Sequence, residues 1–453
     1  MRALVCVLAV AACAPTRSEL RGPVDRELAR RMGAPLQTEL TAETAALLRQ
    51  PLTRDTAVRI ALANNARLRA ALAELGIAGG ELASALGLGP VDVDVSTRFG
   101  SGGLYEFEVE AIQNVIGLVT APRRRAAARA DLAAARALAT ATALGLAART
   151  EIAFDDVVAG QQELELRRTT FDATDAAADV RERMHAVGNA TDLQLARDRD
   201  AREQARIDLA RAEADVEIRR EQLNALLGLA GDQTKWTTAG ALGELPAEAP
   251  ALDDLEQAAV AASLELAAGR EHVTGAENTL GAERVRAWLP ELGVGASVVE
   301  HGAGIEVGPA VRIGIPLFDQ RSGERAKARA TLARAEAELV ASAVELWANA
   351  RAARISALAA YQEARHLRDI VLPLRQQIVD QTLLHYNAMN ADPFELIVAR
   401  RELADAGHQY LDALRRYWND TARISALRRG VDLGGSPMAA RSTGGAAVTA
   451  DQD

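Results

Sequence analysis

The chain has 453 residues, a formal net charge of −10 and only 3% aromatic residues. The acidic balance argues against a nucleic-acid partner. Few aromatic residues and abundant alanine are unlike the core of a large globular domain, and they are typical of long helices that pack closely through small side chains.

Residues 1–12 have the features of a secretory signal peptide, in which the basic residue Arg2 precedes a short apolar stretch. Cys13 follows Val10-Ala11-Ala12, which resembles the lipobox of bacterial lipoproteins, where cleavage precedes the cysteine and acyl chains are attached to it. We expect Cys13 to be lipidated, with an ordinary signal peptide as the alternative. Residues 13–51 are then expected to form a lipid-anchored arm without strong periodicity.

A first structural unit is predicted over residues 52–229. Helical composition at its start gives way to alternating segments at about 91–117, which predict two strands. Long helices are predicted at about 123–187 and 192–227, separated by a glycine-containing turn.

A linker over residues 230–251 precedes a second unit over residues 252–429, in which the same order recurs. Strands are predicted at about 290–317, and long helices at about 320–386 and 393–429. The chain is therefore read as two tandem repeats of the same arrangement.

The helices carry further signals. Pro373 predicts a kink or local irregularity in its long helix. Seven-residue spacing of Leu396, Leu403 and Tyr410 predicts coiled-coil packing. Residues 430–453 are small, polar and glycine-rich, and predict a disordered tail. No run of eighteen or more apolar residues follows the signal peptide, so no membrane-spanning helix is expected.

Both predicted strand pairs alternate strictly between apolar residues and polar or glycine residues. Val91, Val93, Val109 and Val307 illustrate the apolar face. The opposite face is predicted to carry Asp92, Asp94, Glu106, Glu108, Glu110, Glu306 and Arg312.

Two hairpins in one chain cannot close a sheet, and isolated hairpins are only marginally stable. Several copies of the chain could close a barrel together. Lipid tolerates no open sheet edge, so a membrane barrel needs closure, an apolar exterior and a polar interior. The polar face is therefore predicted to line a lumen and to favour cations. A solvated polar face without selectivity is the alternative.

This order of elements resembles that of the TolC-like outer-membrane efflux proteins over nearly the whole chain, from about residue 52 to 429. Residues 61–71 are similar to the family's repeat-opening helix, and residues 308–319 to its segment from the last strand into a long helix. Residues 187–197 and 386–400 are similar to its two helix-tip turns. The sequence departs from the family at Met389, a turn position usually held by glycine.

The resemblance implies a mainly α-helical protein with a small membrane β-barrel, built as a homotrimer whose helices form a tunnel through the periplasm. It implies an exit duct for efflux or secretion, lipid-anchored in the outer membrane and driven by an inner-membrane pump. The helix tips would contact a periplasmic adaptor (membrane fusion) protein. The implied contact residues are Val187, Gly188, Asn189, Ala190, Thr191, Met389, Asn390, Ala391 and Asp392.

No catalytic pattern occurs in the sequence. The histidines are scattered without a His-Glu-x-x-His pair, no cysteine pair could hold zinc, and no phosphate-binding loop or nucleophile elbow is found. We expect no enzyme activity, cofactor or bound metal, and we interpret Met184, His185 and His385 near the tips as exposed helix residues rather than copper ligands. The alternative function is a periplasmic coiled-coil scaffold or adaptor lipoprotein without a pore, although a scaffold does not need amphipathic strands.

Overall fold

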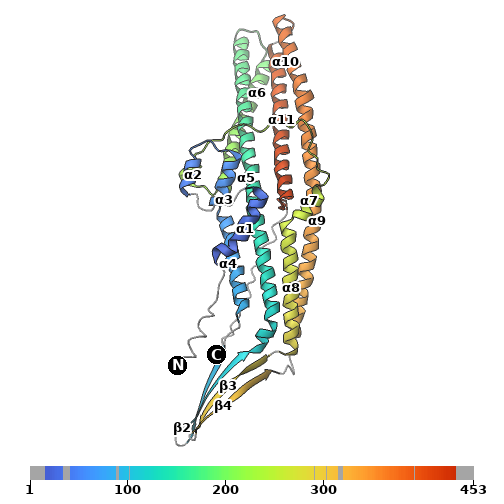
Figure 1. Cartoon of the computed structure of the whole chain (residues 1–453). Helices are drawn as coiled ribbons and strands as arrows, with labels where there is room; N and C mark the ends of the chain where they lie inside the picture. The colour runs from blue at the N-terminus through green and yellow to red at the C-terminus, as the bar shows by residue number, and fades with distance from the viewer. Residues whose placement is uncertain are drawn as a thin grey trace.

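The protein is elongated in the computed structural model, with a small sheet at one end and two helix-to-helix turns at the other (Figure 1). The structure describes residues 16–33, 41–87, 91–100, 103–289, 291–301, 304–314, 320–391 and 393–434. Cys13 and Asp392 lie outside the described residues, as does the tail from residue 435 onward.

The same series of elements occurs twice between the two ends: short helices, a hairpin, and two long antiparallel helices. The first series comprises α3 (Arg54–Asn64), α4 (Ala66–Leu86), β1 (Val91–Gly100), β2 (Gly103–Asn114), α5 (Val115–Ala186) and α6 (Asp192–Leu227). The second comprises α7 (Leu255–Ala262), α8 (Leu264–Trp288), β3 (Glu291–His301), β4 (Gly304–Gly314), α9 (Ser322–His366), α10 (Leu372–Asn387) and α11 (Pro393–Arg428).

Two helices occupy the N-terminal arm, where the sequence indicates no strong periodicity: α1 (Arg17–Met32) and α2 (Thr41–Leu47). Helix α1 is buried through Leu20, Val24 and Leu28, which repeat every four residues and pack towards α4 and α5. Charged residues lie between these three positions and weaken the helical signal of the arm in the sequence.

Helix α5, with 72 residues, organises the fold by contacting α4, α6, α8 and α11. Small residues such as Ala134, Ala143 and Ala147 are fully buried on it, which allows neighbouring helices to approach closely. By composition alone one window of α5 is apolar enough to cross a membrane, but 61% of that window is buried inside the protein. It is therefore a packed core helix.

The main core lies near the middle of the molecule, where the linker joins the helices. Trp236 of the linker is buried there, and its ring N–H donates a hydrogen bond of 2.8 Å to the side-chain oxygen of Asn224. Tyr361 and Tyr417 face each other from α9 and α11, with ring centroids 5.8 Å apart.

The expected irregularity at Pro373 is confirmed. A π-helical turn, Leu367–Val371, interrupts the long helix between α9 and α10, and Pro373 stands at the start of α10. Proline lacks the N–H that a continuous helix needs, so the hydrogen-bond ladder is locally rearranged there.

The two hairpins join into a single antiparallel sheet with strand order β1-β2-β3-β4. The central pairing, β2 with β3, joins the two repeats within one chain. Two glycines of β3 permit this close approach. A Cβ atom on Gly295 would lie 1.9 Å from the carbonyl oxygen of Ala111, and one on Gly293 would lie 2.4 Å from Cγ2 of Ile112.

Candidate channel face and helix tips

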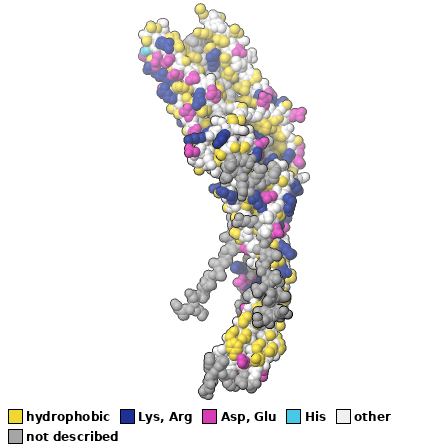
Figure 2. Space-filling model, turned by 60° about the vertical axis from the view of Figure 1, so that its left-hand side comes forward, with side chains coloured by type: hydrophobic (Ala, Val, Ile, Leu, Met, Phe, Trp, Pro, Cys, Tyr) yellow, Lys and Arg dark blue, Asp and Glu magenta, His cyan; other side chains and the backbone are white. Residues whose placement is uncertain are grey.

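One face of the sheet is apolar and uncovered by the rest of the described chain. The register aligns Val95 with Val109, Val109 with Val298, and Val298 with Val307, so valines of all four strands share this face. Glu300 of β3 is a charged exception, aligned with Phe107 and Ile305. Val307 is 73% exposed. A patch of hydrophobic side chains is visible over the strands at the lower end of the molecule (Figure 2). An exposed apolar patch of this kind indicates a surface that contacts a membrane or another protein chain.

The opposite face carries the polar residues. Asp94 pairs with Glu110 across β1 and β2, and Arg312 of β4 aligns with Gly293 of β3. The register brings together on this face all of the residues predicted for it, namely Asp92, Asp94, Glu106, Glu108, Glu110, Glu306 and Arg312. Three apolar residues also lie on it: Ile112, Val299 and Ala310. Ile112 is buried near the helix junction.

Arginines neutralise part of this polar face. Arg98, a residue missed in the sequence although its parity matches, makes an ion pair of 2.9 Å with Glu106. Arg312 reaches from β4 across β3 to Glu110 on β2, at 3.3 Å. The path crosses β3 where Gly293 and Gly295 leave no side chain in the way. Two strands that are not neighbours are thereby linked.

The face remains acidic after this pairing. Ser96 donates a hydrogen bond of 3.4 Å to Glu108. Asp92, Asp94 and Glu306 make no ion pair within the described part of the chain. With Glu291 of β3, which the register also places on this face, seven carboxylates stand against the two guanidinium groups of Arg98 and Arg312.

At the far end, the two tips end their helices with the same hydrogen-bond pattern. In the first tip, the N–H of Asn189 donates to the carbonyl oxygen of Met184 at 2.8 Å, and that of Gly188 donates to His185 at 2.9 Å. These are the two bonds of a Schellman motif, with Gly188 in the left-handed conformation at φ 81°.

The second tip repeats the motif without a glycine. Asn390 donates to the carbonyl oxygen of His385 and Met389 donates to that of Tyr386, both at 2.9 Å. Met389 adopts φ 60° and its side chain is 94% exposed. The left-handed conformation costs a non-glycine residue about 1–2 kcal/mol, so this tip holds a strained residue in full contact with solvent.

Charged residues hold the helices together just below the tips. Arg181 of α5 is buried and pairs with Asp198 of α6 at 2.6 Å, and its guanidinium lies over the ring of Phe394 on α11. This cation–π contact joins the two repeats near their ends. His185 contacts Asp192 at 2.7 Å. Within the described residues, no group of three or more His, Cys, Asp or Glu side chains could hold a metal ion.

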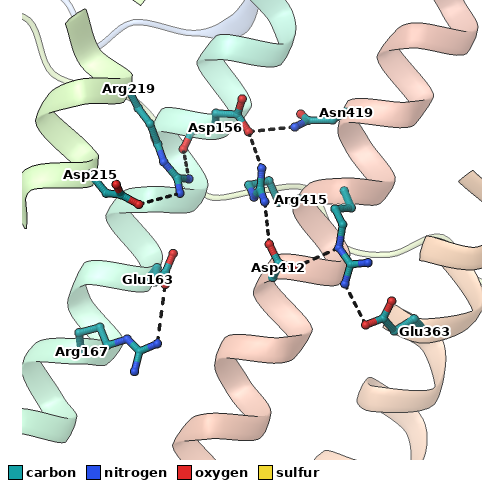
Figure 3. Close-up of polar contacts among 10 residues, drawn as sticks. Asp156, Glu163, Arg167, Asp215, Arg219, Glu363, Asp412, Arg415 and Asn419 are labelled. Atoms are coloured by element: carbon teal, nitrogen blue, oxygen red, sulfur yellow. Dashed lines mark hydrogen bonds and ion pairs between the residues drawn. The ribbon is translucent and has the colours of Figure 1, made fainter. Parts of the chain in front are cut away.

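A polar network crosses the helices near the middle of the molecule (Figure 3). Asp156 of α5 accepts hydrogen bonds from Arg415 (3.1 Å) and Asn419 (2.9 Å) of α11. Arg415 also bonds Asp412, which pairs with Arg416 at 3.1 Å.

Arg416 continues the network to Glu363 of α9, at 2.8 Å. Burial opposes ionisation of Asp412, but the guanidinium groups of Arg415 and Arg416 outweigh it and hold the pKa of its carboxyl below the usual range. The network therefore links α5 to α11, and α11 in turn to α9.

The comparisons with known proteins agree with this architecture. No family model matches the sequence. Cobalt-zinc-cadmium resistance protein CzcC of Cupriavidus metallidurans is 26% identical over 299 residues, which cover 64% of this chain and 70% of CzcC.

Solved structures share the fold. The outer membrane protein VceC of Vibrio cholerae has a TM-score of 0.68 at 16% identity, with 84% of this chain and 96% of VceC covered. The CmeC outer membrane channel of Campylobacter jejuni has a TM-score of 0.68 at 14% identity, with 85% and 87% covered. These structural relatives are channels rather than enzymes. Duplicated helix–hairpin order, fold and sequence similarity all agree with the resemblance to the TolC-like outer-membrane efflux proteins.

Proposed function

We propose that this protein is the outer-membrane exit duct of a tripartite efflux system, a passive conduit through which an inner-membrane pump expels its substrates. The observation that carries the proposal is the opposite polarity of the two sheet faces. The apolar face is uncovered, while all carboxylates of the described strands except Glu300 gather on the other face. Lipid outside and water inside is the environment that such a sheet requires.

The duct is proposed to be a homotrimer. Strands β1 and β4 are the edges of the sheet and lack a partner on one side within the described chain. Pairing β4 of one copy with β1 of the next repeats the same contact around a ring. Three copies of a four-stranded sheet supply twelve strands, within the even-numbered range of bacterial membrane barrels. The complex should have about three times the chain mass of 48.0 kDa.

The proposed cargo is cationic. The lumen would carry seven carboxylates and two arginines from each copy, and rings of carboxylates favour cations in channels. The resistance protein CzcC is named for cobalt, zinc and cadmium, which are metal cations. An acidic lumen would conduct such ions without holding them at a fixed site.

The tips are the proposed contact with a periplasmic adaptor protein. They end the molecule farthest from the sheet, and Val187 and Met389 project their apolar side chains into solvent there, 71% and 94% exposed. An adaptor that covers both side chains would remove this apolar surface from water.

Cys13 is proposed to carry an acyl anchor, each buried methylene of which contributes about 0.8 kcal/mol to membrane binding. Incorporation of a radioactive fatty acid should occur in the wild type and be lost in Cys13→Ser. Equal labelling of the two proteins would contradict lipidation at this residue.

Two neighbouring substitutions test the duct. Val307→Arg should impair membrane insertion, because a cation facing lipid costs about 2–4 kcal/mol at the bilayer midplane. Glu306→Lys should leave insertion intact and shift the reversal potential in planar bilayers away from cations. If neither substitution affects the membrane fraction or the conductance, the strands are not a transmembrane barrel, and the scaffold alternative gains support.

A further inference from the structure

Basic side chains are concentrated where the helices meet the sheet. The eleven residues nearest the sheet on each of α4, α5, α8 and α9 include, in total, eight arginines and lysines and three acidic residues. The corresponding spans at the tips of α5, α6, α10 and α11 contain seven basic and eight acidic residues. The whole chain has a net charge of −10, so the positive end is a local feature.

Four of these cations are available to a partner. Arg123, Arg284, Lys327 and Arg329 are exposed and make no ion pair within the described residues. Two of the neighbouring cations are already engaged: Arg125 caps α4 through the carbonyl oxygen of Leu86 at 2.9 Å, and Arg286 pairs with Glu283 at 2.9 Å. We call the four exposed cations, Arg123, Arg284, Lys327 and Arg329, the basic belt.

Apolar side chains separate the basic belt from the strands. Trp288, at the end of α8, is 86% exposed, and Leu118 and Val119 in the first turn of α5 are more than half exposed. Tryptophan favours the boundary between acyl chains and headgroups, since its ring is apolar and its N–H is polar. From the sheet outward, the order is therefore apolar strands, interfacial side chains and cations.

The distances of the belt residues from the sheet match the thickness of a membrane headgroup layer. The belt residues lie about 6–12 Å along their helices from the ends next to the sheet. A headgroup layer is about 6 Å thick on each side of the hydrocarbon core. Arginine and lysine side chains can extend their charged ends over the difference.

We infer that the basic belt binds the phosphate groups of glycerophospholipids in the periplasmic leaflet, with Trp288 seated at the acyl–headgroup boundary. The inference rests on the proposed membrane insertion of the sheet. Charge complementarity selects the occupant, because phosphate is the anion that every molecule of this layer presents. Anionic lipids should bind more tightly than zwitterionic ones.

The test compares two fourfold variants of the full-length protein with equal changes in net charge. The belt variant is Arg123→Gln, Arg284→Gln, Lys327→Gln and Arg329→Gln. The control changes exposed cations near the tips: Arg183→Gln, Arg197→Gln, Arg400→Gln and Arg401→Gln. Native mass spectrometry in detergent, with added phosphatidylglycerol or phosphatidylcholine, counts the lipids bound to each complex.

The belt variant should lose affinity for phosphatidylglycerol by about tenfold or more, while the control and the wild type remain alike. Equal lipid binding by belt variant and control overturns the inference. Dissociation of the belt variant alone also overturns it, because the cations would then hold protomers together. Conductance of the wild type separates the two proposals: without conductance the duct fails, and with conductance but no lipid preference only the belt fails.

A second measurement does not depend on the fourfold variant. The difference in fluorescence between the wild type and Trp288→Phe, both in bilayers, gives the emission of Trp288 alone. Lipids brominated near the headgroup end of the acyl chain should quench this emission more strongly than lipids brominated near the chain terminus. Stronger quenching by terminally brominated lipids, or no quenching, places Trp288 away from the interface and contradicts the inference.

Discussion

The two hairpins of the sheet have the same parity and different chemistry. The first hairpin supplies Asp92, Asp94 and the three glutamates of β2, whereas the second supplies mainly glycines to the same face, with Glu291, Glu306 and Arg312 as its charged members. Both hairpins keep an apolar opposite face. The duplication has therefore preserved the apolar side of the sheet. On the polar side, the first hairpin carries most of the charged residues, whereas the second carries glycines that leave open space.

The tips show the same kind of divergence. Gly188 and Met389 occupy equivalent positions of two Schellman motifs, at φ 81° and 60°. The hydrogen bonds are the same, so the turn geometry is maintained even where the residue is unfavourable. At the tips, as in the sheet, backbone geometry is preserved between the repeats more strictly than side-chain identity.

The largest expected effect comes from filling the space that the second hairpin provides. Gly295→Val forces a Cβ atom to within 1.9 Å of the carbonyl oxygen of Ala111, so the backbone must move. We expect a loss of stability of about 3 kcal/mol or more and a smaller membrane fraction. Heating in detergent followed by gel mobility measures the assembled complex.

Gly308→Val is the matched control, because it lies on the same face of the same hairpin and its nearest atom, Oγ of Ser297, is 3.9 Å away. It should assemble nearly as the wild type does. Equal damage from both substitutions would mean that β3 and β2 are not closely packed at Gly295.

Substitutions at the two tips should change local stability by an intermediate amount, with opposite signs. Gly188→Ala should destabilise the first tip and Met389→Gly should stabilise the second, each by about 1 kcal/mol, because only glycine adopts positive φ without strain. Hydrogen exchange of the amides of residues 184–189 and 385–390 measures each tip separately. Changes of the same sign at both tips would contradict the proposed equivalence.

The smallest expected effect concerns the link between the hairpins. Arg312→Gln removes the partner of Glu110, a pair that is partly exposed, and should cost less than about 1 kcal/mol. Cation preference should rise, because one lumenal positive charge is lost from each protomer. Reversal potentials under a salt gradient measure this change. A fall in cation preference would mean that Arg312 does not face the conducting path.

Local patterns in the sequence predict much of this structure. Period-two alternation assigns Glu108 and Val109 to opposite faces, and the glycine and proline positions indicate the first tip and the break near Pro373. What sequence does not predict are contacts between distant segments. Arg312 and Glu110 meet over a separation of 202 positions, and Arg181 meets Phe394 only because two helix pairs converge.

The central claim, that the sheet is embedded with one face in lipid, is tested most directly by scanning β4 with spin labels. Single cysteines introduced at positions 305–313 are labelled, reconstituted in bilayers and measured for collision with oxygen and with a polar nickel complex. Oxygen access should peak at odd positions such as Ile305, Val307 and Val311, and nickel access at even positions such as Glu306 and Arg312. Absence of this alternation, or alternation in the opposite phase, would contradict the account.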